Sequence, residues 1–222
     1  MSYKMFNGWK FPEYETRLLA IDEQGNSIYS GLKHIELSLP FVKNYGTMLD
    51  VGANVGLITV PMASKFKKIY AFECVPETYE CLRYNTANLT NVETVNVAVS
   101  DKEGTVKVAI PKSDGVIHSS GWASISEDRQ GIWEEKDIIE VRSQTIDSMN
   151  LDSLDFLKVD VEQAEMMVIR GAINTIKKFR PVIEFENKRR ENLEVIALLN
   201  TIGYNIIPGR KVKSSECIMI SD

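Results

Sequence analysis

The sequence is poor in the residues that build metal centres. It contains two histidines and three cysteines in 222 residues, and Cys74, Cys81 and Cys217 follow none of the spacings of a zinc site. An odd number of separated cysteines is typical of reduced thiols in a cytosolic protein. We therefore expect no metal among the site residues and a cytoplasmic location.

Long apolar runs and an excess of positive charge are also missing. No stretch is long enough to span a membrane, and the opening "MSYKMFNGWKFPEYE" lacks the apolar core of a signal peptide. The formal net charge is -5, whereas nucleic-acid binding depends on clustered Lys and Arg. We expect neither a membrane span nor a nucleic-acid partner.

What the chain does contain is an alternation of strand-like and helix-like segments. Apolar runs predict strands at residues 47–51, 68–73, 92–99, 105–111, 138–143, 154–160, 180–186, 204–208 and 216–221. Helical spacing is found at residues 31–44, 55–66, 76–89, 164–172 and 191–203. A hairpin is expected within residues 17–30, before the alternation begins.

This order indicates an α/β fold with a doubly wound, mostly parallel sheet. The last two strands are joined by a loop too short for a parallel crossover, so one strand at the end of the chain should run antiparallel. We expect residues 1–46 to form an extension that packs on a core domain of residues 47–222. Ligands of such sheets bind at the carboxyl ends of the strands.

The stretch "MLDVGANVGLITV" lies on the first turn from strand to helix. Asp50, Gly52, Asn54 and Gly56 occupy this turn, and Leu57 stands where a dinucleotide site would have a third glycine. No Lys-Ser/Thr pair follows, as a triphosphate loop would require. An acid two residues before the first glycine suits a ligand with an amino group, such as S-adenosylmethionine.

A second acid supports this interpretation. Glu73 ends the next strand, where a carboxylate can accept hydrogen bonds from both hydroxyls of a ribose. The structural alternative is a glycine turn with two helix-capping acids. An NAD-dependent oxidoreductase is the other alternative, and Leu57 and the position of Asp50 oppose it.

The blocks that follow resemble the FkbM family of methyltransferases. They run in order from about Thr47 to Glu186, and they are "LDVGANVG", "YAFECVPE", "NVAVSDKEG", "WASIS", "IDSMNLDSLDFLKVDVEQAE", "VIRGA" and "RPVIEFE". The segment "NGWKFPEYE" also resembles short FkbM-like proteins of phages and marine microbes.

The resemblance implies a class I fold with a seven-stranded sheet, S-adenosylmethionine as methyl donor, and O-methylation of a hydroxyl on a sugar, glycan or natural product. It also implies that Asp50, Gly52, Asn54 and Gly56 hold the methionine part of the donor and that Glu73 holds the ribose. By the same resemblance Ala98 and Val99 flank the adenine, and Asp101 lies nearby.

The block "KVDVEQAE" carries the candidate catalytic residues. Asp160 and Glu162 follow a central strand and could orient an acceptor hydroxyl and take its proton, or hold a divalent cation. Both could instead serve the next helix, as a cap or as N-terminal charge. Glu165 is interpreted as a structural partner, and Lys158 as a partner of Glu184 or Glu186.

Three further features bear on the acceptor. The family usually has glycine where this chain has Gln163. Residues 112–136 are polar and long for a loop, so we expect an acceptor wall or lid there, with Trp122 near its "SGWASIS" turn. His118 lies in this segment and is an outside candidate for a base, whereas His34 is interpreted as a surface or packing residue.

The prediction is therefore an S-adenosylmethionine-dependent O-methyltransferase acting on a sugar, glycan or small molecule. N- or carboxyl-methylation on the same scaffold is an alternative, because the donor half does not determine the acceptor. A module that binds S-adenosylmethionine without catalysis is a second alternative, which Asp160 and Glu162 oppose.

Overall fold

The computed structural model describes residues 2–15, 20–113, 116–117, 120–186, 191–207 and 216–221. The strands are β1 (Tyr3–Phe6), β2 (Trp9–Pro12), β3 (Thr47–Val51), β4 (Lys68–Phe72), β5 (Val92–Val95), β6 (Ala98–Val99), β7 (Gly104–Ser113), β8 (Val116–Ile117), β9 (Lys136–Gln144), β10 (Phe156–Val159), β11 (Val182–Glu186), β12 (Tyr204–Ile206) and β13 (Glu216–Ser221). The helices are α1 (Leu32–Ser38), α2 (Thr59–Met62), α3 (Pro76–Asn85), α4 (Glu127–Gly131), α5 (Glu165–Arg170), α6 (Ile173–Phe179) and α7 (Glu191–Asn200), with short 3-10 helices η2 (Leu39–Phe41), η3 (Ser120–Trp122) and η4 (Asp147–Met149).

The main sheet has seven strands in the order β12-β13-β11-β10-β3-β4-β5. The strands from β11 to β5 pair in parallel, and β13 pairs antiparallel with both β11 and β12. The fold class expected from the sequence is confirmed. The reversed strand is the last in the chain, and it lies one position inside the edge, which β12 forms.

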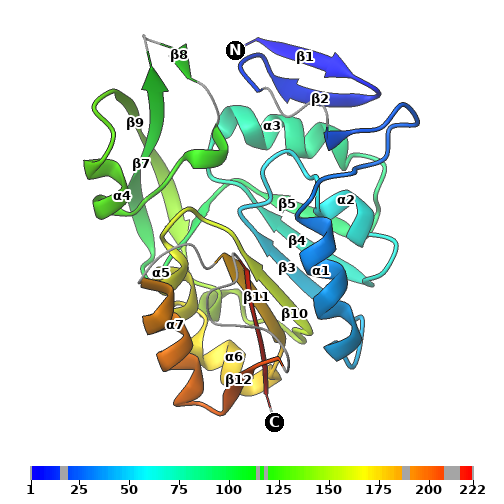
Figure 1. Cartoon of the computed structure of the whole chain (residues 1–222), viewed down its shortest axis with the longest axis vertical. Helices are drawn as coiled ribbons and strands as arrows, with labels where there is room; N and C mark the ends of the chain where they lie inside the picture. Colours follow the sequence, from blue (N-terminus) through cyan, green and yellow to red (C-terminus); the bar gives the residue numbers. More distant parts are fainter. Residues whose placement is uncertain are drawn as a thin grey trace.

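Helices cover both faces of this sheet (Figure 1). Successive residues of a strand point to opposite faces, so Met48 packs with residues of α1 and α2, and Leu49 packs with residues of α5, α6 and α7. Both side chains are fully buried. This two-sided burial explains why the central strands read as continuous apolar runs.

Part of the predicted strand set forms a second sheet of order β6-β9-β7-β8. The run 92–99 is split at Asn96, whose side chain donates to the carbonyl oxygens of Glu73 and Cys74. β5 stays in the main sheet, while β6 pairs with β9. The segment expected as a loop at residues 112–136 contains the end of β7 together with β8, η3 and α4.

One local prediction was too long, and a second is confirmed in part. The helix expected at residues 55–66 is only α2, because Gly56 has a φ of 98° and Pro61 removes a donor. Within residues 17–30 the described part shows one bridge, Ile21 to Ser27, and residues 16–19 lie outside it.

The hairpin near the start of the chain is β1–β2. Its turn is Asn7–Gly8, with φ of 45° and 83°, and Asn-Gly is a strong hairpin signal that the sequence analysis missed. The side-chain amide of Asn85 in α3 exchanges hydrogen bonds with the backbone of Lys10, so this hairpin is fastened to the core (Figure 1). None of the helices formed by the described residues has both the length and the apolar character needed to cross a bilayer.

Candidate active site

The carboxyl ends of β3, β4, β10 and β11 meet at one cavity. The predicted residues that line it are Gly52, Asn54, Glu73, Ala98, Val99, Asp160 and Glu162. Tyr29, Glu186 and the segment Gly121–Ala123 also contribute to its wall. The expected ligand position at the strand ends is therefore where the fold forms a cavity.

The loop after β3 follows a path that few residues can adopt. Gly52 has a φ of 81°, and a Cβ on it would lie 1.9 Å from the carbonyl oxygen of Asp160. Asn54 also has a positive φ, 52°, which asparagine tolerates better than most residues. Gly52 therefore allows the backbone after β10 to approach this loop closely, and its contact with the methionine part of the donor stays a prediction.

Glu73 lines the cavity at the end of β4. Its Oε2 accepts the backbone N–H of Asn54 at 3.0 Å and its Oε1 accepts that of Val75 at 2.8 Å. Burial raises the pKa of Glu73 to about 7, against the opposing effects of these two amides and of the Lys158 charge. Each oxygen retains acceptor capacity for a hydroxyl group in the cavity.

This raised pKa makes donor affinity depend on pH. A carboxylate accepts hydrogen bonds from two ribose hydroxyls, and a protonated carboxyl has one acceptor fewer. With the pKa of Glu73 at about 7, ionisation falls below pH 7, so S-adenosylhomocysteine should bind about tenfold more weakly at pH 6 than at pH 8.

Calorimetry at both pH values measures this, with Glu73→Gln as the test variant. The glutamine side chain has no charge to lose, so the affinity of this variant should be lower at pH 8, by about 1–3 kcal/mol, and nearly constant with pH. Glu93→Gln is the control, because Glu93 lies on the next strand with a half-exposed side chain paired to Lys68. Parental affinity in Glu73→Gln would remove Glu73 from the ribose site.

Asp50 lies beneath the loop and not in the cavity wall. Its carboxylate is fully buried, accepts the Thr59 hydroxyl at 2.6 Å, and lies 3.0 Å from Lys158 Nζ. Lys158 also donates to the carbonyl oxygen of Gly52 at 2.9 Å. The ion-pair partner of Lys158 is therefore Asp50 on β3. The sequence analysis expected Glu184 or Glu186, which belong to β11 on the other side of β10.

This arrangement changes what Asp50 is placed to do. Burial alone would lower the pKa of Lys158, but the carboxylates of Asp50 and Asp160 raise it above its ordinary value, so the ammonium stays charged. Lys158 bridges Asp50 to the loop backbone at Gly52. Contact of Asp50 with the donor's amino group stays a prediction, and the observed contacts position the loop.

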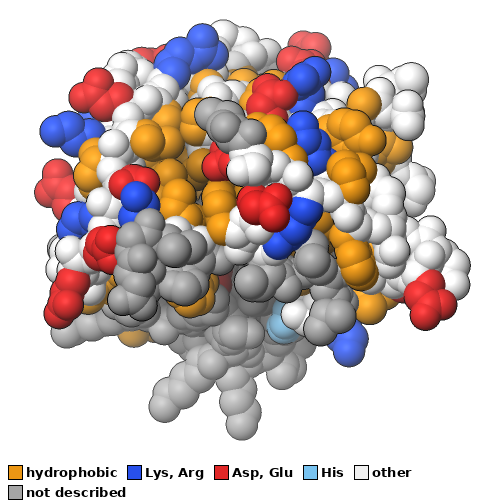
Figure 2. All heavy atoms as spheres, turned by 90° about the horizontal axis from the view of Figure 1, so that it is seen from above, with side chains coloured by type: hydrophobic (Ala, Val, Ile, Leu, Met, Phe, Trp, Pro, Cys, Tyr) orange, Lys and Arg blue, Asp and Glu red, His pale blue; other side chains and the backbone are white. Residues whose placement is uncertain are grey.

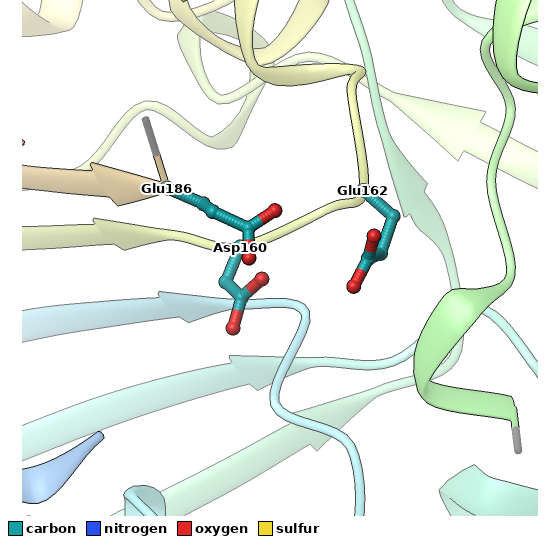
Figure 3. Close-up of side chains that lie close together, drawn as sticks. All are labelled: Asp160, Glu162 and Glu186. Atoms are coloured by element: carbon teal, nitrogen blue, oxygen red, sulfur yellow. The ribbon is translucent and has the colours of Figure 1, made fainter. Parts of the chain in front are cut away.

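Three carboxylates converge at the ends of β10 and β11. Asp160, Glu162 and Glu186 offer oxygens that lie within 4.8 Å of one another, and Figure 3 shows all three side chains directed into the same space. Lys158 Nζ lies 3.9 Å from Asp160 Oδ2. Glu186 was not predicted as a site residue, although it ends a strand as Asp160 does.

The expectation of no metal among the site residues rested on the few histidines and cysteines, and it overlooked these three carboxylates, which could hold a divalent cation. We still expect methyl transfer without one, because the Lys158 ammonium beside Asp160 repels a second cation. A chelator should change the rate less than about twofold. Loss of activity with EDTA and its return with Mg²⁺ would instead make these acids metal ligands.

The loop that carries Glu162 is fixed from two sides. Glu165 is buried, and its Oε1 accepts the N–H groups of Val161 and Gln163 at 3.3 and 3.2 Å. Burial raises the pKa of Glu165 to about 8. The Ser124 hydroxyl, from the segment expected to be a lid, donates to the carbonyl oxygen of Glu162 at 2.6 Å.

The backbone angle at Gln163 explains why a glycine suits this position. Glu162 and Gln163 both have positive φ, 52° and 73°, which costs a non-glycine residue about 1–2 kcal/mol. Gln163→Gly should raise the free energy of unfolding by about 0.5–1 kcal/mol, because the relief of strain exceeds the added freedom of the unfolded chain. Urea denaturation measures this; Gln163→Ala keeps the strain and should not stabilise.

Some predicted residues lie outside the cavity wall. Gly56 packs against Leu82, and a Cβ there would lie 3.1 Å from that side chain. Asp101 accepts the Ser100 hydroxyl at 3.3 Å and lies outside the described wall. His118 is outside the described residues. Trp122 lies in the cavity wall together with Glu73 and Ala98, and its lid or acceptor role stays a prediction.

Comparison with known proteins agrees with this geometry. The sequence profile of the Methyltransferase FkbM domain matches residues 50–206. The chain belongs to the FkbM methyltransferase family. It therefore carries a methyltransferase domain that uses S-adenosylmethionine, and the residues in the cavity fit that donor. Glu73 presents carboxylate oxygens to the cavity, and Ala98 and Val99 line it with apolar side chains. Their contacts with the ribose and the adenine of the donor stay predictions.

Two curated proteins that are similar to this chain have different names. The match to "Probable ribosomal RNA small subunit methyltransferase A" of Methanosphaera stadtmanae is 31% identical over 47% of this chain and 37% of that protein. "Methyltransferase sdnD" of Sordaria araneosa is 26% identical over 56% of this chain and 59% of that protein. The chain thus spans less than two thirds of either relative.

A solved structure shares the fold. The crystal structure of Methyltransferase FkbM from Methylobacillus flagellatus KT superposes with a TM-score of 0.52 and 16% identity. The superposition covers 80% of this chain and 44% of that one. At this identity the likeness concerns the sheet and its helices.

Proposed function

We propose that this protein transfers the methyl group of S-adenosylmethionine to a hydroxyl of a sugar, glycan or small molecule. The observation that carries the proposal is the position of Asp160. Its carboxylate follows the central strand β10, lines the donor cavity and is 36% exposed. A base for an acceptor hydroxyl needs this combination of fixed position and access.

The chain's own residues have distinct parts in this reaction. Bound S-adenosylmethionine supplies an electrophilic methyl group. Asp160 would orient the acceptor O–H and take its proton as the oxygen–carbon bond forms and the carbon–sulfur bond breaks. Lys158, 3.9 Å from Asp160, fixes the carboxylate electrostatically. Glu162 and Glu186 offer acceptors for further hydroxyl groups of the same molecule.

A nucleic-acid acceptor is not part of the proposal, although the name of one relative refers to ribosomal RNA. On the described part of the face in Figure 2, Lys and Arg side chains are interspersed with Asp and Glu. A nucleic-acid footprint would gather the positive charges into a patch. With Cys74 and Cys81 present as thiols, we also propose a cytoplasmic location.

The test has a binding part and a transfer part. Calorimetry should show binding of S-adenosylhomocysteine and none of NAD. Release of S-adenosylhomocysteine should then be followed with sugars, oligosaccharides, amines, carboxylic acids and RNA as acceptors, and the methylated atom identified by NMR. A methyl ether supports the proposal; a methylamine or methyl ester as the main product would replace it with N- or carboxyl-methylation.

A further inference from the structure

The donor loop, residues 52–57, needs support from the structure around it. Gly52, Asn54 and Leu57 of this loop line the donor cavity. Asn54 has a φ of 52°, and a residue with a side chain keeps such a conformation only where the surrounding structure holds it. The helix after the loop, α2, has only four residues. The shape of the cavity therefore depends on what else contacts the loop.

Apolar side chains of the donor loop pack with the β1–β2 hairpin. Val55 and Leu57 belong to one hydrophobic cluster with Trp9 and Phe11 of β2 and with Cys81 of α3. All five side chains are buried. Because Leu57 also lines the cavity, one residue of the cavity wall packs in the same cluster as the hairpin.

The side chain of Asn85 connects the same two segments through hydrogen bonds. Asn85 is the last residue of α3, which lies beside the hairpin (Figure 1). Its Oδ1 accepts the N–H of Lys10 at 2.8 Å, and its Nδ2 donates to the carbonyl oxygens of Lys10 at 3.0 Å and of Val55 at 2.8 Å. One amide group thus holds the hairpin and the donor loop to the same helix.

The contacts of the donor loop come from two sides. Near its start, Lys158 donates to the carbonyl oxygen of Gly52 at 2.9 Å, and Glu73 accepts the N–H of Asn54 at 3.0 Å. These two partners belong to the strands of the main sheet or directly follow them. Further along the loop, the contact at Val55 comes from the side chain that also fastens the hairpin.

We infer that the β1–β2 hairpin is a working part of the donor site, and that it holds the donor loop in the shape that receives S-adenosylmethionine. Asn85 is then a positioning residue, because it contacts the loop and is not in the cavity wall. The sequence analysis gave residues 1–46 no part in donor binding. The inference concerns the donor, so it holds for any acceptor.

A coupling of this kind is reciprocal. If the docked hairpin raises the affinity for the donor, the bound donor must stabilise the docking of the hairpin by the same factor. A hairpin that only covered the core would contribute to stability without this coupling. Donor affinity and the opening of the hairpin therefore both test the inference.

Asn85→Ala should raise the Kd for S-adenosylhomocysteine about 3–10-fold, the effect of losing about one hydrogen bond that shapes the loop. Asn91→Ala is the matched control, because the half-buried Asn91 amide donates to the carbonyl oxygens of Ala63 and Phe66, both at 2.8 Å, away from the cavity wall. Its Kd should stay within about twofold of the parent. Calorimetry measures both, after urea denaturation has shown that each variant is folded.

Asn85→Asp separates the two contacts of the amide. The carboxylate keeps an acceptor for the N–H of Lys10 and has no N–H to donate to Val55. Donor affinity should therefore fall at least as far as in Asn85→Ala. Parental affinity in folded Asn85→Ala and Asn85→Asp, or an equal loss in Asn91→Ala, overturns the inference.

Hydrogen exchange of the parent protein tests the coupling without any substitution. Saturating S-adenosylhomocysteine should slow exchange of the amides in residues 3–12 about 3–10-fold, and by less in Asn85→Ala. Helix α6 is the internal reference for a general gain in stability. Equal slowing in the hairpin and in α6, or none in the hairpin, overturns the inference and leaves the proposed function standing. If S-adenosylhomocysteine fails to bind the parent at all, the proposed function falls as well.

Discussion

Asp160→Asn is expected to lower kcat by about 10²–10⁴-fold, the contribution of a positioned general base, while the protein stays folded and binds donor. The asparagine side chain has the same shape and cannot take a proton. Asp160 lines the cavity and directly follows a strand whose residues Phe156–Val159 are buried. The substitution therefore changes the chemistry at a rigid position.

The pH profile of kcat separates a base from a residue that only positions its neighbours. A base gives a rising limb as it loses its proton, and Asp160→Asn should lack that limb. If proximity supplies the rate, the mutant keeps the parental pH profile. Asp152→Asn, an exposed aspartate that precedes the same strand, is the matched control. Parental turnover in Asp160→Asn would direct attention to Glu162, which lines the same cavity, and to His118.

Lys158→Met is expected to lower the free energy of unfolding by about 3–5 kcal/mol, since it leaves a buried carboxylate without its cation. Asp50 is fully buried, and in this variant the Thr59 hydroxyl, at 2.6 Å, remains as its hydrogen-bond donor. The variant also loses the hydrogen bond from Lys158 to the carbonyl oxygen of Gly52, which helps to hold the loop after β3 in place. Donor affinity should therefore fall together with stability.

A double substitution distinguishes loss of the ion pair from loss of packing. Asp50→Asn combined with Lys158→Met removes both charges and keeps an acceptor for Thr59, so it should be more stable than Lys158→Met alone. Urea denaturation of the parent, both single variants and the double variant measures the coupling. Lys177→Met, at an exposed lysine of α6, is the control. Additive effects would mean that Lys158 and Asp50 do not stabilise each other.

The positions of Glu73 and Asp160 were predictable from the sequence. Each follows an apolar run, and the carboxyl ends of parallel strands meet at one edge of the sheet. The turn at Gly52 and Asn54 was predictable because positive φ angles favour glycine and asparagine. These features depend on a few neighbouring residues, so the local pattern contains them.

The partner of Lys158 was decided only by the tertiary structure. β10 lies between β3 and β11, with Lys158 in register with Asp50 on one side and with Glu184 on the other. Both neighbours are acidic, so the sequence pattern favours neither. The ammonium group forms its ion pair with Asp50, far earlier in the chain, because the loop carbonyl of Gly52 offers it a second acceptor.

The tertiary structure also decided which distant segments complete the site. Glu186 joins Asp160 and Glu162 because β11 pairs in parallel with β10. Tyr29 reaches the strand ends because α1 packs against the sheet and Ser38 contacts Glu184. The sequence by itself determined the fold class, the family and the residues at the strand ends, since these follow from local patterns. The grouping of Glu186 with the acids that follow β10, and the place of Tyr29 in the cavity wall, follow from contacts between segments far apart in the chain, which only the packed structure brings together.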